Sequence, residues 1–387
     1  MNKVYLPPSR IGVIGGGQLG RMLAFEAKRM GYEVFVLDPK ENSPAGQVSD
    51  FQFVASFDDF EALLSLSQKT DILTYEFEHI NVEHLLRLKE MGYKIYPSPE
   101  TLKIIQNKYL QREYLKRLGL PVPKFKRVES FEDLIIKAGQ FSFPLMLKHA
   151  RGGYDGKGNI LIKGQKDLEE FKNFDFKREI FIEEYINFKK EISIILCRNL
   201  DGDLKFYLPF ENYHENSILK ITKCPADIKE DVKKEAINIA KAVLEGFDDV
   251  GVFCIEMFLD YDDRIYINEI APRVHNSGHL TIEACVSSQF ENHLRSIANL
   301  PLGSTELLKR AAMINILGDR KLTGKYTIEG FKDLLKMNGI YVHLYGKDFV
   351  DNKKKIGHVT VIGETDEEIN EKIEFVKNNL KIGEFNG

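Results

Sequence analysis

The stretch Gly152-Gly153-Tyr154-Asp155-Gly156-Lys157-Gly158 decides which folds this chain of 387 residues can adopt. Its four glycines within seven residues predict a loop whose backbone can wrap around phosphate groups. The loop follows an apolar run, Pro144 to Lys148, that is predicted to be a strand ending in a lysine. This arrangement holds nucleotide phosphates in other proteins, although the chain has no Walker motif. The alternative is an ordinary hairpin, but a mere turn gains little from Tyr154 and Asp155.

Further along the chain, two apolar runs carry one glutamate each. The runs around Glu256 and Glu269 predict a hairpin over residues 251–270 with both carboxylates at least half buried. If Asp262-Asp263 is a two-residue turn, Glu256 faces Glu269, whereas a slip of one residue would put Asn268 there. Two buried like charges across a strand pair are unfavourable, and Mg²⁺ removes the conflict. The alternative is that a lysine or arginine neutralises one glutamate.

A polar, proline-broken segment, residues 271–279, follows the second glutamate directly and predicts a loop. We expect an anion beside the metal to lie within reach of its donors, which are Arg273, His275, Asn276 and Ser277. A lone loop histidine is most often structural, but a cluster directly after a metal carboxylate favours anion binding.

Another glycine motif, Gly15 to Gly20, fits G-x-G-x-x-G and lies between a predicted strand at 11–14 and a predicted helix. Asp38 ends the next strand, where dinucleotide folds place a ribose-binding acid. Free N–H groups at the helix start attract a phosphate. On this motif alone, a nucleotide cofactor and a Rossmann-like scaffold with a phosphate or no ligand are equally supported. The downstream motifs favour the second interpretation, and we expect no NAD binding.

Strand and helix signals alternate over residues 1–99 and predict a parallel sheet. Pro97-Ser98-Pro99 marks a boundary, and Ser98 is predicted to cap a helix that carries Lys108. Further elements are predicted as a strand at 94–96, a helix at 230–244, a strand at 355–362 and a helix at 367–380. The boundaries predicted from these signals give four segments, which are 1–99, 100–120, 121–187 and 188–387, the last ending in a small lobe from about 310.

Composition narrows the class of protein. The chain is 43% hydrophobic and 29% charged with a net charge of −4, which is typical of a globular protein of two or three domains. No segment has the basic excess that nucleic-acid binding needs, and no apolar run of about 18 residues predicts a membrane helix. The four cysteines form no Cys-x-x-Cys pair, and no signal peptide is visible, so we expect a cytoplasmic location.

The order of these motifs resembles that of the ATP-grasp ligases. The residues that carry this likeness are Lys108, Lys148, the glycine loop, Glu183-Glu184-Tyr185-Ile186, Glu256 and Asn268-Glu269. Within that superfamily the chain resembles the 5-(carboxyamino)imidazole ribonucleotide synthases of purine biosynthesis from about residue 11 to 360. The strings that carry this closer likeness are Gly17 to Met22, Tyr75 to Glu78, Gly152 to Gly158, Asn268 to His279 and Lys355 to His358.

The resemblance implies a mixed α/β and α+β fold, in which an ATP-grasp core joins an N-terminal Rossmann-like (pre-ATP-grasp) domain and a small C-terminal lobe. It implies a reaction in which ATP phosphorylates bicarbonate to carboxyphosphate. The amine of 5-aminoimidazole ribonucleotide then takes the carboxyl group, giving N5-carboxyaminoimidazole ribonucleotide, ADP and phosphate. Mg²⁺ and a homodimer are implied as well.

The resemblance also implies residue roles. ATP would contact Lys108, Lys148, Gly153, Gly156, Gly158, Glu183, Glu184, Ile186, Glu191, His214 and Asn268. The ribonucleotide would contact Gln18, Leu19, Glu76, Asn276, Ser277 and Lys355. The reacting groups would meet Tyr154, Asp155, Arg273, His275 and Lys355, and the metal would bind Glu256 and Glu269. Either Asp155 or the released phosphate takes the amine proton. The chain departs from the family pattern at His79, Lys354 and Asn159.

Two other functions compete with this interpretation. One is a sister ATP-grasp ligase, such as a formate-dependent glycinamide ribonucleotide transformylase or a biotin carboxylase-like enzyme. The string His275 to His279 and the short C-terminal lobe disfavour it. The other is an NAD-dependent dehydrogenase or nucleotide-binding regulator built on the first glycine motif. That function would leave the carboxylate pair and the second glycine loop without a purpose.

Overall fold

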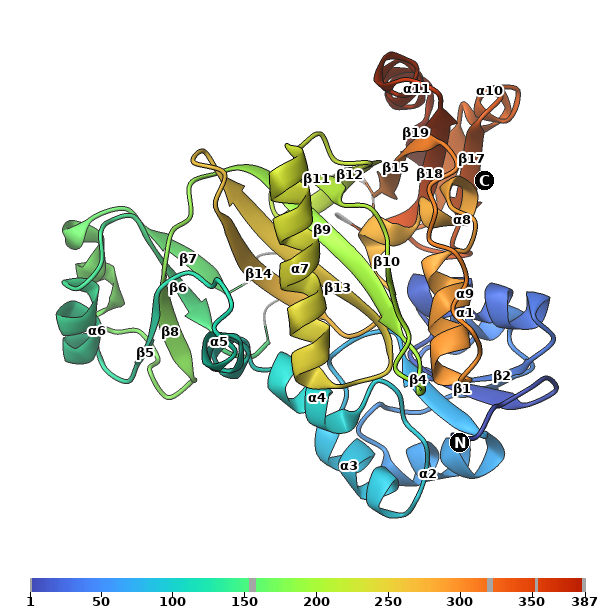
Figure 1. Cartoon of the computed structure of the whole chain (residues 1–387), viewed down its shortest axis with the longest axis horizontal. Coiled ribbons are helices and arrows are strands. Elements are labelled where there is room, and N and C mark those ends of the chain that lie inside the picture. Colours follow the sequence, from blue (N-terminus) through green and yellow to red (C-terminus); the bar gives the residue numbers. More distant parts are fainter. Residues whose placement is uncertain (1, 153–157, 319–322, 352–353, 385–387) are drawn as a thin grey trace.

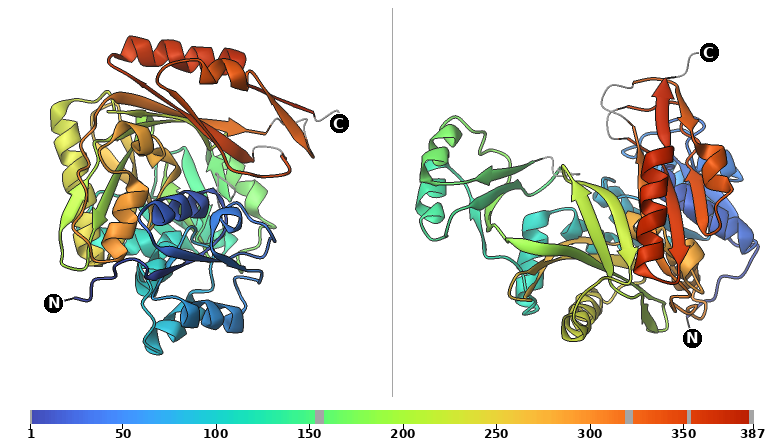
Figure 2. Two further views of the ribbon diagram at one scale, coloured as in Figure 1. Left: turned by 90° about the vertical axis from the view of Figure 1, so that its right-hand side faces the viewer. Right: turned by 90° about the horizontal axis from the view of Figure 1, so that it is seen from above.

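The structure, a computed structural model, describes residues 2–152, 158–318, 323–351 and 354–384. Figure 1 shows a large central sheet, with the first domain (blue) below it and a separate lobe (green) to one side. The C-terminal strands and helices (red) lie at the far end of the large sheet from that lobe (Figure 2). Within the described residues, no helix combines the length and the apolar character needed to cross a membrane.

A parallel sheet organises the first domain, as the alternating signals predict. Its strands lie in the order β3-β2-β1-β4, and all their pairings are parallel. Its elements are β1 (Arg10–Ile14), α1 (Gln18–Arg29), β2 (Glu33–Leu37), η1 (Gly46–Val48), β3 (Phe51–Phe53), α2 (Phe60–Lys69), β4 (Ile72–Tyr75) and α3 (Val82–Glu90). The strand predicted at 94–96 is reduced to a single bridge between Ile95 and Leu73, because Pro97 follows directly.

The prediction of a single helix that carries Lys108 is wrong, because two helices occupy this region. They are α4 (Pro99–Ile105) and α5 (Lys108–Arg117). Ser98 caps the first, as predicted. The side chain of Asn107 accepts a hydrogen bond from the Leu110 N–H at 3.0 Å and so caps a second helix in place of continuing the first. Lys108 therefore stands in the first turn of α5.

Four strands form the lobe, in the order β5-β8-β6-β7 with antiparallel pairings. Its elements are β5 (Phe125–Val128), α6 (Phe131–Ala138), β6 (Leu145–His149), β7 (Asn159–Ile162), η2 (Gln165–Phe171) and β8 (Ile180–Glu184). Leu145 and Leu147 of β6 point into the lobe's own apolar core. Lys148 pairs with Phe181, two residues from Glu183, so Lys148 and Glu183 lie on one face of the sheet.

The large sheet contains nine strands within the described residues, in the order β14-β13-β9-β11-β12-β15-β18-β17, with β10 beside β9. The elements of this part are β9 (Phe188–Arg198), β10 (Leu204–Phe206), β11 (Phe210–Glu215), β12 (Ile218–Cys224), α7 (Glu230–Phe247), β13 (Gly251–Asp260), β14 (Ile265–Ala271), η3 (Asn276–Gly278), α8 (Thr281–Ala284), α9 (Gln289–Ile297), β15 (Arg310–Leu317), β16 (Tyr326–Glu329), α10 (Phe331–Leu335), β17 (Ile340–Leu344), β18 (Lys355–Gly363), α11 (Asp366–Asn379) and β19 (Lys381–Glu384). The predicted elements at 230–244, 251–270, 355–362 and 367–380 are confirmed within a few residues.

Three of the C-terminal strands continue this sheet, whereas β16 and β19 form a two-stranded sheet of their own. β15 pairs with β12, β18 with β15 and β17 with β18, all antiparallel. Residues after 310 do pack a small apolar cluster of their own against α11. Their backbone nevertheless extends the same hydrogen-bonded sheet that carries Glu256 and Glu269.

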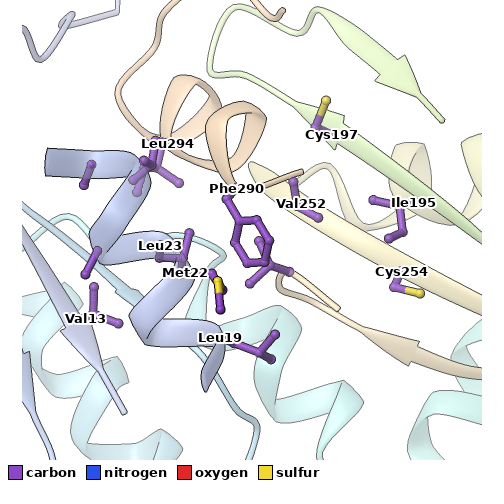
Figure 3. Packing of buried hydrophobic residues seen from close by; sticks show 14 of the residues in the cluster. Val13, Leu19, Met22, Leu23, Ile195, Cys197, Val252, Cys254, Phe290 and Leu294 are labelled. Carbon is purple, nitrogen blue, oxygen red and sulfur yellow. The ribbon is translucent and has the colours of Figure 1, made fainter. Parts of the chain in front are cut away.

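One hydrophobic core joins the first domain to the large sheet. Figure 3 shows Phe290 of α9 between Met22 and Leu23 of α1 on one side and Val252 of β13 on the other. Phe290 is buried together with Leu294 one turn later. Because α1 begins at the first glycine turn, this packing fixes that turn relative to the large sheet.

Candidate active site

A cleft of about 680 Å³ opens where the first domain, α5, the lobe and the large sheet meet. Glu76 follows β4, Lys148 lies on β6 and Glu269 lies on β14. All three side chains line the cleft, although they come from three different sheets. The cleft therefore depends on how the parts of the chain pack together.

Two carboxylates face each other on the large sheet. Glu256 of β13 is paired with Glu269 of β14, as predicted. Burial, and after it the charge of Glu269, raises the pKa of Glu256 to about 7. For Glu269, burial alone would raise the pKa, but the charges of Lys108 and Lys148 outweigh it and leave the pKa below its usual value. The Lys108 Nζ lies 3.4 Å from a Glu269 oxygen.

The predicted two-residue turn at Asp262-Asp263 is wrong. Asp260 pairs with Arg264 through a backbone hydrogen bond of 3.0 Å, so the loop has three residues and ends at Asp263 with φ of 64°. This longer loop shifts the register by one residue. A β-bulge at Asn268 shifts it back, because Met257 pairs with Ile267 while the preceding residues pair Glu256 with Glu269. The two shifts cancel, which is why the two glutamates still face each other.

Three charged side chains form a buried cluster beside the carboxylate pair. A Glu183 oxygen accepts from the Arg112 Nε at 2.6 Å, and the other oxygen accepts from the Lys148 Nζ at 2.5 Å. Side-chain exposure is 2% for Glu183, 3% for Arg112 and 9% for Lys148. Burial opposes ionisation of Glu183, but its two cationic partners lower its pKa to about 2. Burial also lowers the pKa of Lys148.

The loop after β14 holds a histidine in a fixed orientation. The His275 Nδ1 lies 2.9 Å from the Ser277 hydroxyl, and its Nε2 lies 3.5 Å from a Glu256 oxygen. The side-chain amide of Gln289 accepts a hydrogen bond from the His275 backbone N–H and donates one to the His275 carbonyl oxygen. Burial, and after it the charge of Arg273, lowers the pKa of His275 well below its usual value. His275 is therefore a neutral imidazole at physiological pH.

Two neighbours of His275 line the cleft. Arg273 forms an ion pair of 2.7 Å with Glu78 of the first domain. Both polar atoms of the Asn276 amide are buried without a hydrogen-bond partner among the described residues. A ligand with one donor and one acceptor would satisfy that amide.

The first glycine turn holds carboxylates of its own. Glu76 accepts hydrogen bonds from the N–H groups of Gly17 and Gly20, the second at 2.6 Å. Asp38 accepts from the Gly16 N–H at 2.8 Å. The predicted attraction of this turn for a phosphate is therefore wrong, because Glu76 already sits at the start of α1. Burial raises the pKa of Glu76, and the two backbone hydrogen bonds act against that rise.

A histidine and a glutamate meet on neighbouring strands of the large sheet. His214 of β11 forms an ion pair with Glu191 of β9, and both line the cleft. Burial alone would lower the pKa of His214, but its hydrogen bond to Glu191 and that carboxylate's charge outweigh burial and raise it.

Three family models match the chain, namely a ribonucleotide synthetase preATP-grasp domain over residues 9–106, an ATP-grasp domain over 113–290 and a phosphoribosylaminoimidazole carboxylase C-terminal domain over 311–372. The N5-carboxyaminoimidazole ribonucleotide synthase of Bacillus subtilis (strain 168) is 38% identical over 367 residues, which is 95% of this chain and 94% of the relative. The crystal structure of N5-carboxyaminoimidazole ribonucleotide synthetase from Thermotoga maritima is 45% identical with a TM-score of 0.89, covering 97% of this chain and 100% of the other.

The chain belongs to the N5-carboxyaminoimidazole ribonucleotide synthase family. The family resemblance and the predicted fold class are thereby confirmed. Another family structure, from Aspergillus clavatus, is described as a complex with ADP and 5-aminoimidazole ribonucleotide. It is 34% identical with a TM-score of 0.88, and the match covers 96% of this chain and 98% of the other.

Most residues to which the family resemblance assigns a role line the one cleft. Those that do are Gln18, Leu19, Glu76, Lys108, Lys148, Glu183, Glu184, Ile186, Glu191, His214, Glu256, Asn268, Glu269, Arg273, His275, Asn276 and Lys355. Gly158 and Ser277 do not line it, and Ser277 is fully buried with its hydroxyl 2.9 Å from the His275 Nδ1. Gly153, Tyr154, Asp155 and Gly156 lie outside the described residues. His79 and Asn159 line the cleft, and Lys354 does not.

Several lining residues were missed from the sequence. They are Gln106, Arg112, Met146, Phe181, Tyr185, Phe188, Ile192, Asn212, Met257 and Phe258 among others. Arg112 had a usable signal, because it follows Lys108 by four residues and so shares its face of α5. The apolar residues had none, since a strand residue that lines a cleft and one that fills a core have the same pattern.

Proposed function

We propose that the chain converts 5-aminoimidazole ribonucleotide, ATP and bicarbonate to N5-carboxyaminoimidazole ribonucleotide, ADP and phosphate. One observation carries the proposal: the lysines and opposed carboxylates suited to ATP share a single cleft with Gln18 and Glu76 of the first domain. Two substrates bound at these places are held within one continuous space, which a transfer between them requires.

In the proposed ATP half of the cleft, Lys108 and Lys148 hold the phosphates. The opposed carboxylates of Glu256 and Glu269, with Asn268 in the bulge between them, fit Mg²⁺, which takes its other ligands from phosphates and water. Among the described residues, no group of three or more His, Cys, Asp or Glu side chains has a metal-binding arrangement, which fits a metal shared with the substrate. When bound, Mg²⁺ offsets phosphate charge.

In the proposed ribonucleotide half, Glu76 is already anchored by two backbone N–H groups and can accept a hydrogen bond from a ribose hydroxyl. Gln18 and Leu19 line the same part of the first domain. The Asn276 amide, which lacks partners among the described residues, supplies a donor and an acceptor. Arg273 and Lys355 add positive charge to the cleft.

The proposed chemistry has two steps. A bicarbonate oxygen attacks the γ-phosphorus and displaces ADP, which gives carboxyphosphate. The substrate amine then attacks the carboxyl carbon, phosphate leaves, and the amine proton passes to Asp155 or to that phosphate. His275 is neutral, and its Nδ1 faces Ser277, so its Nε2 is the nitrogen available to the anion. Water would hydrolyse the carboxyphosphate, so the transfer requires that water be excluded from the cleft.

Further parts of the proposal concern the whole protein. We propose segments at 1–99, 100–120, 121–187 and 188–387 for the ribonucleotide domain, the connection, the lid and the large ATP-grasp part, with the C-terminal lobe at about 310–387. We further propose a cytoplasmic homodimer.

An ADP-release assay tests the function. With Mg²⁺, ATP and 5-aminoimidazole ribonucleotide, ADP release should rise when bicarbonate is added, and the carboxylated product should appear in equal amount. Formate with glycinamide ribonucleotide should give neither. Calorimetric titration should show ATP binding and no NAD binding. ADP release that depends on formate would contradict the proposal. So would a titration that shows NAD binding and no ATP binding.

A further inference from the structure

The buried cluster of Arg112, Glu183 and Lys148 carries an unusual charge balance. Two cations surround one carboxylate, which leaves one excess positive charge in side chains that are at most 9% exposed. Buried charges are ordinarily paired one to one. Since all three residues line the cleft, the excess charge faces the space in which an anionic ligand would bind.

The same cluster poses a problem for Lys148. Its ammonium already lies 2.5 Å from Glu183, so a phosphate that binds Lys148 shares the charge of Lys148 with that carboxylate. If Lys148 were the sole cation beside it, a Glu183 carboxylate that is 2% exposed would be poorly compensated, which is strongly destabilising for a buried charge. Arg112 removes this cost, because its Nε stays 2.6 Å from the second oxygen of Glu183.

We propose that Arg112 is a positioning residue for nucleotide binding, which keeps Glu183 compensated when a phosphate shares the charge of Lys148. This inference rests on the proposed function only in that the cleft binds ATP or ADP. Arg112 does not contact the nucleotide in this scheme. It acts through Glu183, and α5 holds it on the helix face that also carries Lys108.

The charged groups around Glu183 make the effect specific. Arg112 and Lys148 contact it directly, and Lys108 with Glu269 lies beyond Lys148 as a pair of its own. Without Arg112, nucleotide binding would leave Glu183 with only a cation that it shares with a phosphate. Glu183 must then hold Lys148 back or take up a proton. Both outcomes are measurable in nucleotide binding alone.

The test is a double-mutant cycle read by calorimetric titration with ADP and Mg²⁺. Arg112→Met should raise the Kd of ADP by at least about tenfold, and binding should now take up close to one proton, seen as a dependence of the heat on the buffer. In the Glu183→Gln background, Arg112→Met should change the Kd of ADP by less than about threefold. ADP binding should then take up no proton, because position 183 no longer carries a carboxylate that needs a cation.

Two further variants keep the test clear of general damage. Arg112→Lys retains the charge and should restore most of the affinity, and Arg117→Met, an exposed arginine on the same helix, should behave as the unchanged protein. Thermal melting checks that each variant folds. In steady state, Arg112→Met should raise the KM for ATP and leave that for the ribonucleotide unchanged.

Equal losses of affinity in the two backgrounds would mean that Arg112 contacts the nucleotide directly, and no loss in Arg112→Met would mean that a bound phosphate does not weaken the pairing of Lys148 with Glu183. Either result overturns the inference. The failure of the proposed function looks different. In that case the unchanged protein does not carboxylate the ribonucleotide. The double-mutant cycle at Arg112 measures ADP binding in the absence of the ribonucleotide, so its result does not depend on that reaction.

Discussion

The carboxylate of Glu76 shows how one residue serves fold and function together. It accepts from the N–H groups of Gly17 and Gly20 at the start of α1, and it lines the cleft. The glycines were predictable from their spacing, but the group that fills their turn was not. Glu76 lies 59 residues from Gly17 in the sequence, and only the parallel pairing of β1 with β4 brings them together.

Glu76 and Lys148 should have opposite effects on the two substrates. Glu76→Gln keeps the size of the side chain but turns an N–H₂ group towards one backbone donor. The KM for 5-aminoimidazole ribonucleotide should therefore rise by an amount equivalent to about 1–3 kcal/mol. The KM for ATP should stay unchanged. Lys148→Ala should raise the KM for ATP alone. Steady-state kinetics with each substrate varied in turn measures both. Equal changes in the two Michaelis constants for either variant would contradict separate sites.

Glu269→Gln should separate catalysis from stability. The substitution relieves the repulsion with Glu256 but also removes the partner of Lys108, so the two effects offset each other and the melting temperature without metal should change little. Turnover should fall by several orders of magnitude, because a proposed metal ligand loses its charge. ADP release and thermal melting on the same preparation give both values. Near-normal ADP release would exclude Glu269 as a metal ligand.

A buried imidazole should make stability fall in acid. The His293 Nδ1 accepts from the Val252 N–H at 3.1 Å, its Nε2 lies 2.8 Å from the Thr74 hydroxyl, and burial lowers its pKa from 6.5 to about 3. The unfolded chain therefore takes up a proton between these values that the folded one does not. His293 contributes its full stability above pH 6.5 and loses it as the pH falls towards 3.

His293→Gln should remove this pH dependence. Between about pH 5.5 and 4, the unfolding free energy of the unchanged protein should fall by about 1.4 kcal/mol more per pH unit than that of the variant. Urea denaturation at several pH values measures both slopes. The substitution also shifts the whole curve downwards because it disturbs two buried contacts, so the slopes are compared and not the absolute values. Parallel curves would rule out the titration of His293.

At the scale of elements, the chain shows which errors sequence patterns produce. The apolar runs located β13 and β14, but the turn between them was one residue too short, and only the bulge at Asn268 restored the predicted pairing. Loop length and bulges depend on backbone conformation, such as the positive φ of Asp263, which alternation does not encode. The break between α4 and α5 was visible in principle, since Asn107 is a strong capping residue.

The cap of α5 should matter for nucleotide binding, and the cap of α4 should not. Asn107→Ala removes the hydrogen bond from the Leu110 N–H and the one that the Asn107 Nδ2 donates to Glu179 at 2.6 Å, and should cost about 1–3 kcal/mol of stability. Because Lys108 stands in the turn that this cap fixes, the Kd of ADP should rise as well. Ser98→Ala removes the matching cap of α4 and is the control, with similar destabilisation and unchanged ADP affinity. Equal ADP affinities for both variants would show that the cap does not position Lys108.

At the scale of the whole molecule, the shared core and the separate lobe predict different unfolding behaviour. Residues of α1, α9 and β13 form one core, whereas the lobe packs around its own. Strand order could not be predicted, because neighbours such as β12 and β15 lie far apart in the sequence. The pattern identifies strands but not their partners, and so the C-terminal strands looked like a separate lobe.

Single tryptophans can report on these parts, since the chain has none. In urea without ligand, Phe60→Trp in the first domain and Phe206→Trp in the large sheet should show coincident transitions. Phe131→Trp in the lobe should unfold at lower urea, and ADP with Mg²⁺ should move that transition upwards. A single transition for all three probes would show that the lobe is not an independent unit.

The place of β18 in the large sheet has a consequence for synthesis on the ribosome. Gln18 and Lys355 line the same cleft, so its wall combines residues that lie far apart in the sequence and are translated at different times. Until β15 and β18 emerge, β12 is the edge of an unfinished sheet and can pair with another nascent chain. A product terminated before about residue 310 would lack Lys355 and keep that open edge, so it would aggregate and could not assemble a complete cleft.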